Sequence, residues 1–392
     1  MSLLIDAGSH PIAHRFLEDP DSMEFVHPYQ LWFSEKSGLI QVVDPVSASE
    51  LYSNYFCLSS WKSTPHISQL LHIIKEEVCL GTDASIIEIA SNDGSFLAEL
   101  KAAGYNNLQG IEPASDAVEA SLRRAIPVIQ DYLTVETAVS LSQQLGQYDC
   151  LIARHVMEHI ADLDDFCEAI VLMLKPGATL LIEVPDFGYC LDTLDYSGLW
   201  EEHVNYFTYP VLKSQLARFG IEVVDYQNAR FSGTAMILVC KFTGERIPYS
   251  ATVVDDERKR AYAFRDNWPT FCQRLQDEVD DLKEANGSVP IWGAGCRTCA
   301  LVNFSGVQGI SYFVDDQSDK QGKLMPGSRL PIYPRQKLLD EGVKVCLLGV
   351  NYENEDKVIK KATQDGLEDV NFISIHPPSH RLFGFWKNMI GD

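Results

Sequence analysis

Residues 86–94 constrain the fold of this chain more than any other stretch. An apolar strand with Glu88 near its centre runs into a turn of small and polar residues, and the helix-forming residues 95–100 follow at once. In open α/β sheets, ligands bind outside the carboxyl ends of the strands, which is where this turn falls. The sequence therefore predicts an α/β protein with a ligand pocket at the turn.

A second acidic residue ends the next predicted strand. Glu112 closes the strand 108–112 and lies 24 residues after Glu88. A carboxylate at this place can accept hydrogen bonds from both hydroxyls of an adenosine ribose. Gly94 is the only glycine of the turn, so the pattern Gly-x-Gly-x-x-Gly, which lets a pyrophosphate approach the backbone, is absent. A nucleoside without a pyrophosphate, such as S-adenosylmethionine, fits this arrangement better.

We expect this cofactor to be bound by the turn and by the strand ends beside it. The turn and the first two strand ends contribute Glu88, Ala90, Ser91, Asn92, Asp93, Gly94, Glu112 and Pro113. A polar and aromatic strand end suited to adenine contributes Gln130, Asp131 and Tyr132, and the following strand closes the pocket with Arg154 and His155.

Charge and composition narrow the class of partner. Acidic residues outnumber basic ones by 55 to 32, for a net charge of −23. Such a chain repels phosphate backbones, so we expect a small-molecule substrate and no nucleic acid. No apolar run approaches the roughly 18 residues of a membrane span, and the N-terminus lacks a basic region followed by an apolar one. We therefore expect a cytoplasmic protein that does not contact a membrane.

The order of predicted strands and helices divides the chain into four parts. Residues 1–70 form a small strand-and-loop module, 71–245 alternate strands and helices as βαβ units do, 246–285 form a helical linker, and 286–392 form a second, shorter α/β domain. The predicted central strands are 86–90, 108–112, 149–153, 178–184, 221–226 and 234–241, with helices 67–79, 94–103, 115–123, 163–174 and 210–218. The later strands of the last domain are 310–314, 344–349 and 370–374.

Residues 155–159, His-x-x-Glu-His, match the spacing of a zinc peptidase motif. Two histidines four apart can share one face of a helix, but the sequence offers no third ligand. The motif also falls beside the expected cofactor pocket, so we expect His159 to face the substrate and no metal to be bound. The alternative is that His155 and His159 cap or pack against the following helix. The pair Cys296 and Cys299 is expected to be part of the core.

His203 follows Glu202 in a segment rich in aromatic residues. The ordinary pKa of histidine suits proton transfer near neutrality, and a neighbouring carboxylate can fix its tautomer. This pattern predicts a general base, with an ordinary surface histidine as the alternative.

Residues 291–298 form an incomplete dinucleotide-binding turn. Thr298 takes the place of the third glycine, and Asp315 and Asp316 end a strand about the expected 20 residues further on. An oxidoreductase that uses NAD through residues 291–316 is therefore the competing class of function.

Taken together, the motifs resemble the S-adenosylmethionine-dependent C-methyltransferases that act on nucleotide-linked deoxysugars. The resemblance extends over essentially the whole chain and is carried by residues 88–95, 110–113, 202–203 with 206–207, 314–316, 320–327 and 349–352. It implies a class I methyltransferase Rossmann-like central domain between a small N-terminal zinc-binding module and a second Rossmann-like domain. It also implies that His203 removes a proton beside a 4-keto group, and that His159 and Tyr55 steady the resulting enolate.

The chain departs from this family in two places. Ser34 and Ser37 stand where the family has a Cys-x-x-Cys zinc knuckle, and serine hydroxyls do not replace thiolates on zinc, so we expect a module without metal. Trp200 replaces a tyrosine, and an indole donates one N–H but cannot shuttle a proton.

The sequence thus predicts C-methylation of a nucleotide-linked keto-deoxysugar, or a related small molecule of natural-product biosynthesis. O- or N-methylation of another small molecule is the alternative acceptor chemistry. A binding protein with a retired active site is a further alternative, and the sequence leaves the oligomeric state open.

Overall fold

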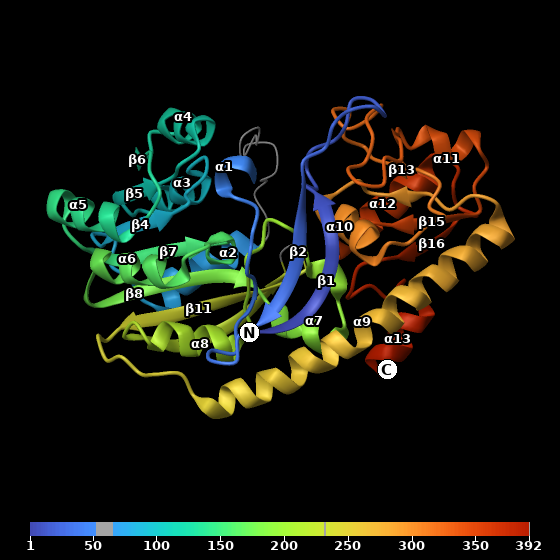
Figure 1. Cartoon of the computed structure of the whole chain (residues 1–392). Coiled ribbons are helices and arrows are strands. Elements are labelled where there is room, and N and C mark those ends of the chain that lie inside the picture. The colour runs from blue at the N-terminus through green and yellow to red at the C-terminus, as the bar shows by residue number, and fades with distance from the viewer. Residues whose placement is uncertain (52–65, 231–232, 392) are drawn as a thin grey trace.

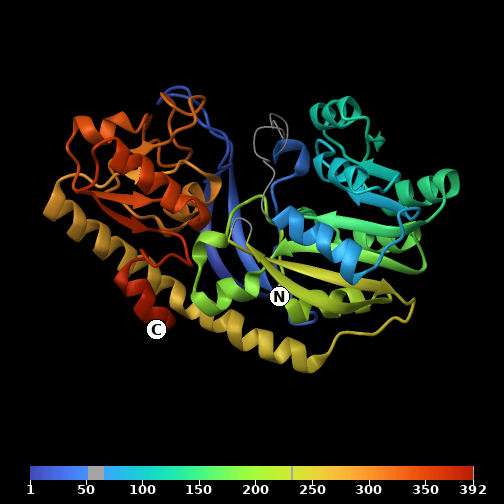
Figure 2. The ribbon, with the colours of Figure 1, turned by 180° about the vertical axis from the view of Figure 1, so that it is seen from behind.

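The computed structural model describes residues 1–51, 66–230 and 233–391. Within them the chain forms three β-sheets, which lie side by side with β1 and β2 between the other two (Figures 1 and 2). The seven-stranded central sheet has the order β10-β11-β8-β7-β4-β5-β6. Its strands β4 to β8 are parallel, whereas β11 runs antiparallel to both β8 and β10. This is the strand order of class I methyltransferases, so the predicted fold is confirmed.

The central sheet contains every strand predicted for it, with bounds that differ by a few residues. The strands are β4 (Ser85–Ile89), β5 (Asn107–Ile111), β6 (Val128–Ile129), β7 (Tyr148–Arg154), β8 (Leu174–Pro185), β10 (Ile221–Arg230) and β11 (Thr234–Phe242). The helices are α2 (His66–His72), continued by a π-helix (Ile73–Glu77), α3 (Ser95–Ala102), α4 (Ser115–Arg123), α5 (Val135–Leu145), α6 (Leu163–Met173) and α8 (Tyr209–Ala217).

The central sheet is buried on both faces. Side chains of successive residues in β4 and β7 point to opposite sides, and apolar residues occupy both sets of positions. Ile87, Leu151 and Leu180 belong to the core on one face, whereas Ile86 and Ile152 belong to the core on the other. This packing fixes the carboxyl ends of the strands, where the cavity described below opens.

The N-terminal sheet takes its last strand from a distant part of the chain. Its order is β1 (Ser2–Pro11), β2 (Val26–Phe33), β3 (Ile40–Val42) and β9 (Asn205–Tyr206). Ile40 pairs with Tyr206, so the N-terminal strands hold the segment that carries His203. The short helix α1 (Ala48–Leu51) follows β3.

The C-terminal sheet is a parallel five-stranded sheet of the order β14-β13-β12-β15-β16. Its strands are β12 (Ile291–Trp292), β13 (Phe313–Val314), β14 (Ile332–Tyr333), β15 (Val345–Leu348) and β16 (Asn371–Ser374). The helices of this part are α10 (Cys296–Ser305), α11 (Gln336–Asp340), α12 (Tyr352–Gln364) and α13 (Gly384–Ile390). The second Rossmann-like domain predicted from the sequence is therefore present.

A single helix, α9 (Ala251–Asn286), connects the central and C-terminal sheets and runs along one side of the molecule (Figures 1 and 2). Phe264 and Phe271 of α9 are fully buried in a core that also contains residues of β1, β2, α7 (Phe187–Thr193) and β12. Many of the charged residues that make this segment look like a linker are exposed, whereas Glu257 is buried and lies 2.9 Å from Arg260. Where the domain boundaries fall stays a prediction.

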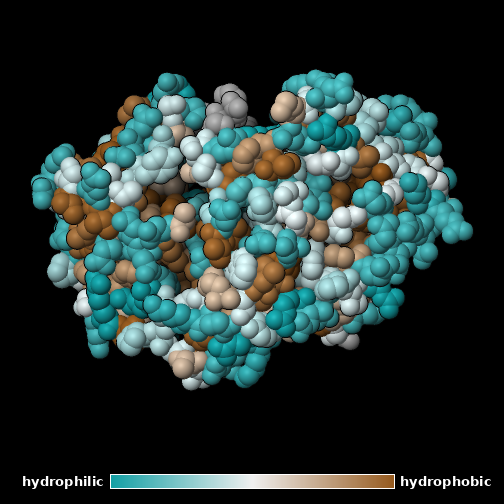
Figure 3. Space-filling model, in the orientation of Figure 1, coloured by the Kyte–Doolittle hydropathy of each residue, from teal (hydrophilic) through white to brown (hydrophobic). Residues whose placement is uncertain are grey.

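Hydrophilic residues cover most of the face shown in Figure 3, with apolar residues in scattered groups among them. No helix in the described ranges has the length and apolar character that crossing a membrane requires.

Candidate active site

A cavity of about 930 Å³ opens at the carboxyl ends of β4, β5, β7 and β8. It continues past the 3₁₀ turn Met157–His159 to residues 198–207 and reaches α1 and the first turn of α10. Among the cofactor residues predicted from the sequence, those lining it are Glu88, Ala90, Ser91, Asn92, Asp93, Glu112, Pro113, Asp131, Tyr132, Arg154 and His155. The predicted catalytic residues His159, Glu202 and His203 line the same cavity, whereas Tyr55 lies outside the described residues.

Two predicted cofactor residues do not line the cavity. Gly94 precedes α3, with φ +70°, and a β-carbon there would lie 2.5 Å from the Ser121 hydroxyl. Gln130 donates a hydrogen bond to the carbonyl of Pro113 at 3.3 Å. Gly94 therefore packs behind the turn, and Gln130 contacts the backbone of Pro113, which lines the cavity.

The turn after β4 is held to the end of β5 by Glu112. One oxygen of this carboxylate accepts a hydrogen bond from the backbone N–H of Asn92, and the other accepts one from Ala114, both at 2.9 Å. The two bonds orient the carboxylate toward the cavity and leave further lone pairs for a ligand. Burial raises the pKa of Glu112, while the two backbone hydrogen bonds oppose this shift.

Two buried polar atoms in the same wall have no hydrogen-bond partner among the described residues. They are the Ser91 hydroxyl and Oε2 of Glu88. Buried polar groups are generally hydrogen-bonded, so unsatisfied atoms beside a cavity point to a polar ligand. Together with the oriented Glu112, these atoms fit the ribose and amino acid parts of S-adenosylmethionine.

Asp93 is already engaged with the protein. Its carboxylate lies 2.6 Å from the Arg124 guanidinium and accepts the backbone N–H of Ser95 at 3.1 Å. These hydrogen bonds outweigh burial and lower its pKa. Part of the function of Asp93 is therefore to hold the start of α3.

A buried network of charges lies under the cavity, between β4, β7 and β8. Glu183 Oε2 lies 3.5 Å from Arg154 Nε, and Glu183 Oε1 lies 3.1 Å from His66 and 3.4 Å from His155. Burial raises the pKa of Glu88 to about 7, although Arg154 opposes this shift. Glu183 and His66 were not predicted from the sequence, in which the signal for Glu183 is an acid at the end of a predicted buried strand.

The His-x-x-Glu-His segment does not place its two histidines on one helix face. His155 has a left-handed backbone with φ +48° and precedes the 3₁₀ turn, so its ring points back to Glu158, 3.1 Å away. His159 instead donates a hydrogen bond from Nδ1 to the carbonyl of Glu202 at 2.8 Å. The geometry considered for a helical zinc motif is therefore not formed by this pair.

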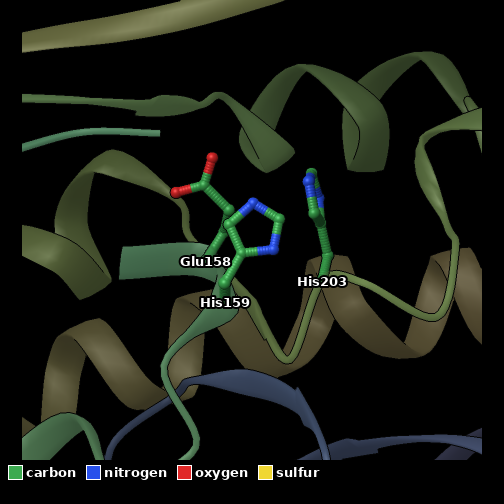
Figure 4. Close-up of side chains that lie close together, drawn as sticks. All are labelled: Glu158, His159 and His203. Atoms are coloured by element: carbon green, nitrogen blue, oxygen red, sulfur yellow. The ribbon is translucent and has the colours of Figure 1, made fainter. Parts of the chain in front are cut away.

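His203 lies beside His159 in the cavity wall. The two rings meet edge to face with their centroids 5.0 Å apart, and the ring of Trp200 lies 3.9 Å from that of His203 (Figure 4 shows the histidines). Burial lowers the pKa of His203 well below its ordinary value, and the charges of His159, His155 and Arg297 lower it further. A neutral imidazole at this place can accept a proton.

The neighbouring acids are held by the N-terminal segment. Glu202 lies 3.0 Å from His14 Nδ1, and Glu201 accepts the backbone N–H of Ala13 at 2.7 Å. The expected contact between the Glu202 carboxylate and His203 is not among the hydrogen bonds of the described residues; the backbone of Glu202 contacts His159 instead. Burial and the charge of Glu202 raise the pKa of Glu201 to about 7.

Two groups of side chains in the described residues could hold a metal ion. One is Glu158 with His159 and His203, and the other is His14 with Glu201 and Glu202.

The turn at residues 34–38, where Ser34 and Ser37 stand in place of two cysteines, is held by hydrogen bonds. The Gly38 N–H donates to the Ser34 carbonyl at 2.8 Å, and the Ser37 N–H donates to the Ser34 hydroxyl at 3.2 Å.

The turn after β12 packs tightly against the end of β15. Gly293 has φ +119°, and a β-carbon there would lie 2.4 Å from the carbonyl oxygen of Gly349. The Thr298 hydroxyl donates to the same carbonyl at 2.7 Å, and Asp315 accepts the backbone N–H of Ala294 at 2.8 Å. Close packing within the fold is thus enough to explain the glycine at position 293, and no bound dinucleotide is needed to explain it.

Comparison with known proteins finds methyltransferase domains in this chain. Residues 65–226 match the family model of a methyltransferase domain, and residues 251–377 match that of a C-methyltransferase C-terminal domain. The C-methyltransferase NovU of Streptomyces niveus is 24% identical over 369 residues, which cover 90% of this chain and 88% of NovU. A ubiquinone biosynthesis O-methyltransferase of Chelativorans sp. is 32% identical over 91 residues, 23% of this chain and 36% of that enzyme.

Among solved structures, a methyltransferase of Anabaena variabilis has a TM-score of 0.41 at 14% identity, covering 50% of this chain and 96% of its own. The 1,6-didemethyltoxoflavin N1-methyltransferase of Burkholderia thailandensis has a TM-score of 0.38 at 13% identity, covering 52% and 95%.

The fold, the cavity and the matching family models define an S-adenosylmethionine-dependent methyltransferase. The match of the C-terminal part and the similarity to NovU along most of the chain support a place among the C-methyltransferases.

Proposed function

We propose that this enzyme methylates a carbon atom beside the keto group of a nucleotide-linked deoxysugar. The observation that carries the proposal is the pair formed by the buried His203 and the half-buried His159, which line the same cavity as Glu112. Methylation of a heteroatom needs at most one base, whereas carbon needs a base and a group that stabilises the enolate oxygen. The pair offers one imidazole for each purpose.

His203 is proposed as the general base. Since burial lowers its pKa, its ring is neutral at pH 7 and can take the proton from the carbon beside the carbonyl. The electron pair of the broken C–H bond then moves toward the carbonyl oxygen and forms the enolate. His159, whose Nδ1–H is bonded to the Glu202 carbonyl, would donate from Nε2 to that oxygen when both of its ring nitrogens carry a proton.

S-adenosylmethionine, when bound, supplies a methyl group already activated by its sulfonium. Glu112, Ser91 and Glu88 would hold it beside the two histidines, because these residues line the same cavity. Residues of α1, the segment 198–207 and Arg297 of α10 also line the cavity, which supports a substrate site between the three parts of the chain.

The test is methyl transfer from labelled S-adenosylmethionine to a panel of nucleotide-linked 4-keto-deoxysugars, with His203→Gln as the comparison. We expect a product with a new carbon-bound methyl group in its NMR spectrum and a loss of about 10²- to 10⁴-fold in the variant. A methyl group on oxygen or nitrogen would indicate the alternative acceptor chemistry. Turnover unchanged in His203→Gln would overturn the assignment of the base.

A further inference from the structure

Glu158, His159 and His203 lie close together in the wall of the cavity (Figure 4). One carboxylate oxygen of Glu158 and one ring nitrogen of each histidine all lie within 4.8 Å of one another. Three atoms with such separations have a common point within about 2.8 Å of each of them (4.8/√3), and zinc binds nitrogen and oxygen ligands at roughly 2.0–2.2 Å. Shifts of less than about 1 Å would therefore bring all three atoms to one metal ion.

Glu158 has a buried oxygen that the fold does not use. The residue is 1% exposed and lines the cavity. Its Oε1 lies 3.1 Å from His155 Nδ1, whereas Oε2 has no hydrogen-bond partner among the described residues. Buried polar atoms are generally satisfied, and a buried carboxylate is stabilised by a cation. An oxygen in this state, beside two imidazole rings, points to a positively charged ligand.

The two histidines are placed as nitrogen ligands. His159 donates its Nδ1–H to the Glu202 carbonyl at 2.8 Å, which leaves the lone pair of the neutral ring on Nε2. Metal-binding histidines generally donate their other N–H in this way, because the bond fixes the tautomer and orients the ring. The ring of His203 is held by the rings of Trp200 and His159, with centroids 3.9 and 5.0 Å away, and such contacts do not use a nitrogen lone pair.

Outer contacts also hold the third ligand. His155 contacts one oxygen of Glu158 and is itself 3.4 Å from Glu183, so the carboxylate is backed by a second buried acid. The Val204 N–H donates to the Glu158 carbonyl at 2.7 Å and so ties the segment of His203 to that of Glu158. The ligand atoms are thus held together before any ion binds, which lowers the cost of ordering them.

We propose that Glu158, His159 and His203 form a binding site for a divalent transition metal ion such as Zn²⁺. Two imidazoles and one carboxylate are a ligand set that zinc accepts, whereas Mg²⁺ and Ca²⁺ are bound mainly by oxygen. Three protein ligands leave a fourth position for water or a substrate oxygen, on the side where the group lines the cavity.

Occupation of this site should inhibit the enzyme; this consequence rests on the proposed function, whereas the metal site does not. A neutral imidazole has one lone pair, and a metal ion on His203 takes the lone pair that the proposed base needs. The ion also takes Nε2 of His159, from which the enolate oxygen is to receive a hydrogen bond. Zinc and the proposed reaction therefore exclude each other.

A second group, His14 with Glu201 and Glu202, has a similar size and serves as the comparison. Its acids are engaged with the N-terminal segment, since Glu202 lies 3.0 Å from His14 Nδ1 and Glu201 accepts the Ala13 N–H at 2.7 Å. Among the described residues, neither of its carboxylates has a buried oxygen without a hydrogen-bond partner, in contrast to Glu158.

The experiment is an NMR titration of the full-length protein, labelled with ¹⁵N-histidine, with Zn²⁺ after EDTA treatment and removal of the chelator. The ring signals are assigned from the spectra of His159→Gln and His203→Gln. One equivalent of Zn²⁺ should shift the signals of both rings, with Nε2 as the coordinated nitrogen of His159, and Mg²⁺ should shift neither. Signals of the two rings that stay unchanged with Zn²⁺ would overturn the proposal, whether or not any variant folds.

Calorimetric titration with Zn²⁺ identifies the carboxylate. Glu158→Gln should weaken binding at least tenfold, because an amide oxygen carries no charge. Glu201→Gln is the matched control, since it removes a buried acid of the same cavity that belongs to the other group, and it should leave the affinity nearly unchanged. Binding that is lost in Glu201→Gln and kept in Glu158→Gln would overturn the proposal.

Methyl transfer measured at the same Zn²⁺ concentrations tests the consequence for the reaction. We expect activity to fall as the site fills and to return when EDTA is added. Full activity of protein whose His159 and His203 rings are zinc-bound would contradict His203 as the base, and with it the proposed function. Ring signals that do not respond to zinc would instead overturn the metal site, so the two failures are distinguishable.

Discussion

The ring of Trp200 lies over the ring of His203, with centroids 3.9 Å apart and an interplanar angle of 40°. Tyr206 closes the loop of residues 200–206 that contains both rings. Its hydroxyl donates to the Trp200 carbonyl at 3.1 Å and lies 3.3 Å from the Trp200 backbone nitrogen. Trp200 therefore keeps the proposed base out of water and in one orientation. It does so without the hydroxyl that a tyrosine would bring.

Replacing Trp200 by Ala should move the acidic limb of the pH profile. Burial lowers the pKa of His203, so the proposed base should stay neutral, and the enzyme active, to a pH well below 6.5. Activity is lost as the pH falls through this pKa. In Trp200→Ala water reaches the ring, the pKa rises toward 6.5, and the acidic limb of kcat/KM between pH 5 and 8 moves up. Trp200→Phe keeps the stacked ring and should keep the limb in place; an unmoved limb in the alanine variant would argue against this role of the indole.

Glu112→Gln should weaken binding of S-adenosylhomocysteine at least tenfold. Both oxygens of Glu112 accept backbone N–H groups, so an amide must turn its NH₂ either toward one of these donors or toward the ribose. If the ligand is present at about 100 times its Kd, it stabilises the protein by roughly 2.7 kcal/mol, and a tenfold weaker Kd removes about half of that. Thermal unfolding with and without the ligand measures the difference. Glu119→Gln, on the exposed side of α4, is the control and should bind normally.

Gly110→Ala should disturb the cofactor turn from the neighbouring strand. A β-carbon at Gly110 would lie 2.4 Å from the Ser91 hydroxyl and 3.0 Å from the Ser91 β-carbon. Because Ser91 is buried beside the cavity, the added methyl group must push the turn, at a cost of about 1–3 kcal/mol. Urea unfolding should show this loss together with weaker binding of S-adenosylhomocysteine. Gly295→Ala has nothing within 4 Å of the new atom and should change neither quantity.

The strands of the central sheet could be predicted because burial on both faces leaves continuous apolar runs in the sequence. Residues 178–184, for example, lie within β8, and 86–90 match β4 within one residue. Elements with little buried surface are harder to predict: α5, in which Ala138 is the buried residue, was missed, and of the two-residue strand β6 only the strand end at 130–132 was expected. Their local pattern carries too little of the apolar periodicity on which prediction depends.

The side chains at the candidate site show more clearly what cannot be predicted from the sequence alone. His159, Glu202 and His203 could be selected as single residues because their side chains carry chemistry. Their mutual geometry depends on the pairing of Ile40 with Tyr206 and on the bond from Val204 N–H to the Glu158 carbonyl. These contacts join segments that are distant in sequence, and no local pattern specifies them. The left-handed backbone of His155 turns its ring away from His159, and the spacing of the two histidines in the sequence does not predict it.

The buried ion network should make stability depend on pH through His155. Its folded-state pKa of about 9 lies above the ordinary 6.5, so its contribution to the free energy of unfolding is fully present below pH 6.5 and is lost as the pH rises through 9. The shift corresponds to a contribution on the order of 3 kcal/mol.

His155→Asn is the suitable variant, because asparagine tolerates the left-handed backbone at φ +48°. Unfolding in urea at several pH values should show that the stability advantage of the unsubstituted protein over His155→Asn shrinks between pH 6.5 and 9. His72→Asn, at an exposed histidine that lies 3.8 Å from Glu77, should show no such trend. A constant difference between the unsubstituted protein and His155→Asn over this range would mean that His155 is not charged in the folded state.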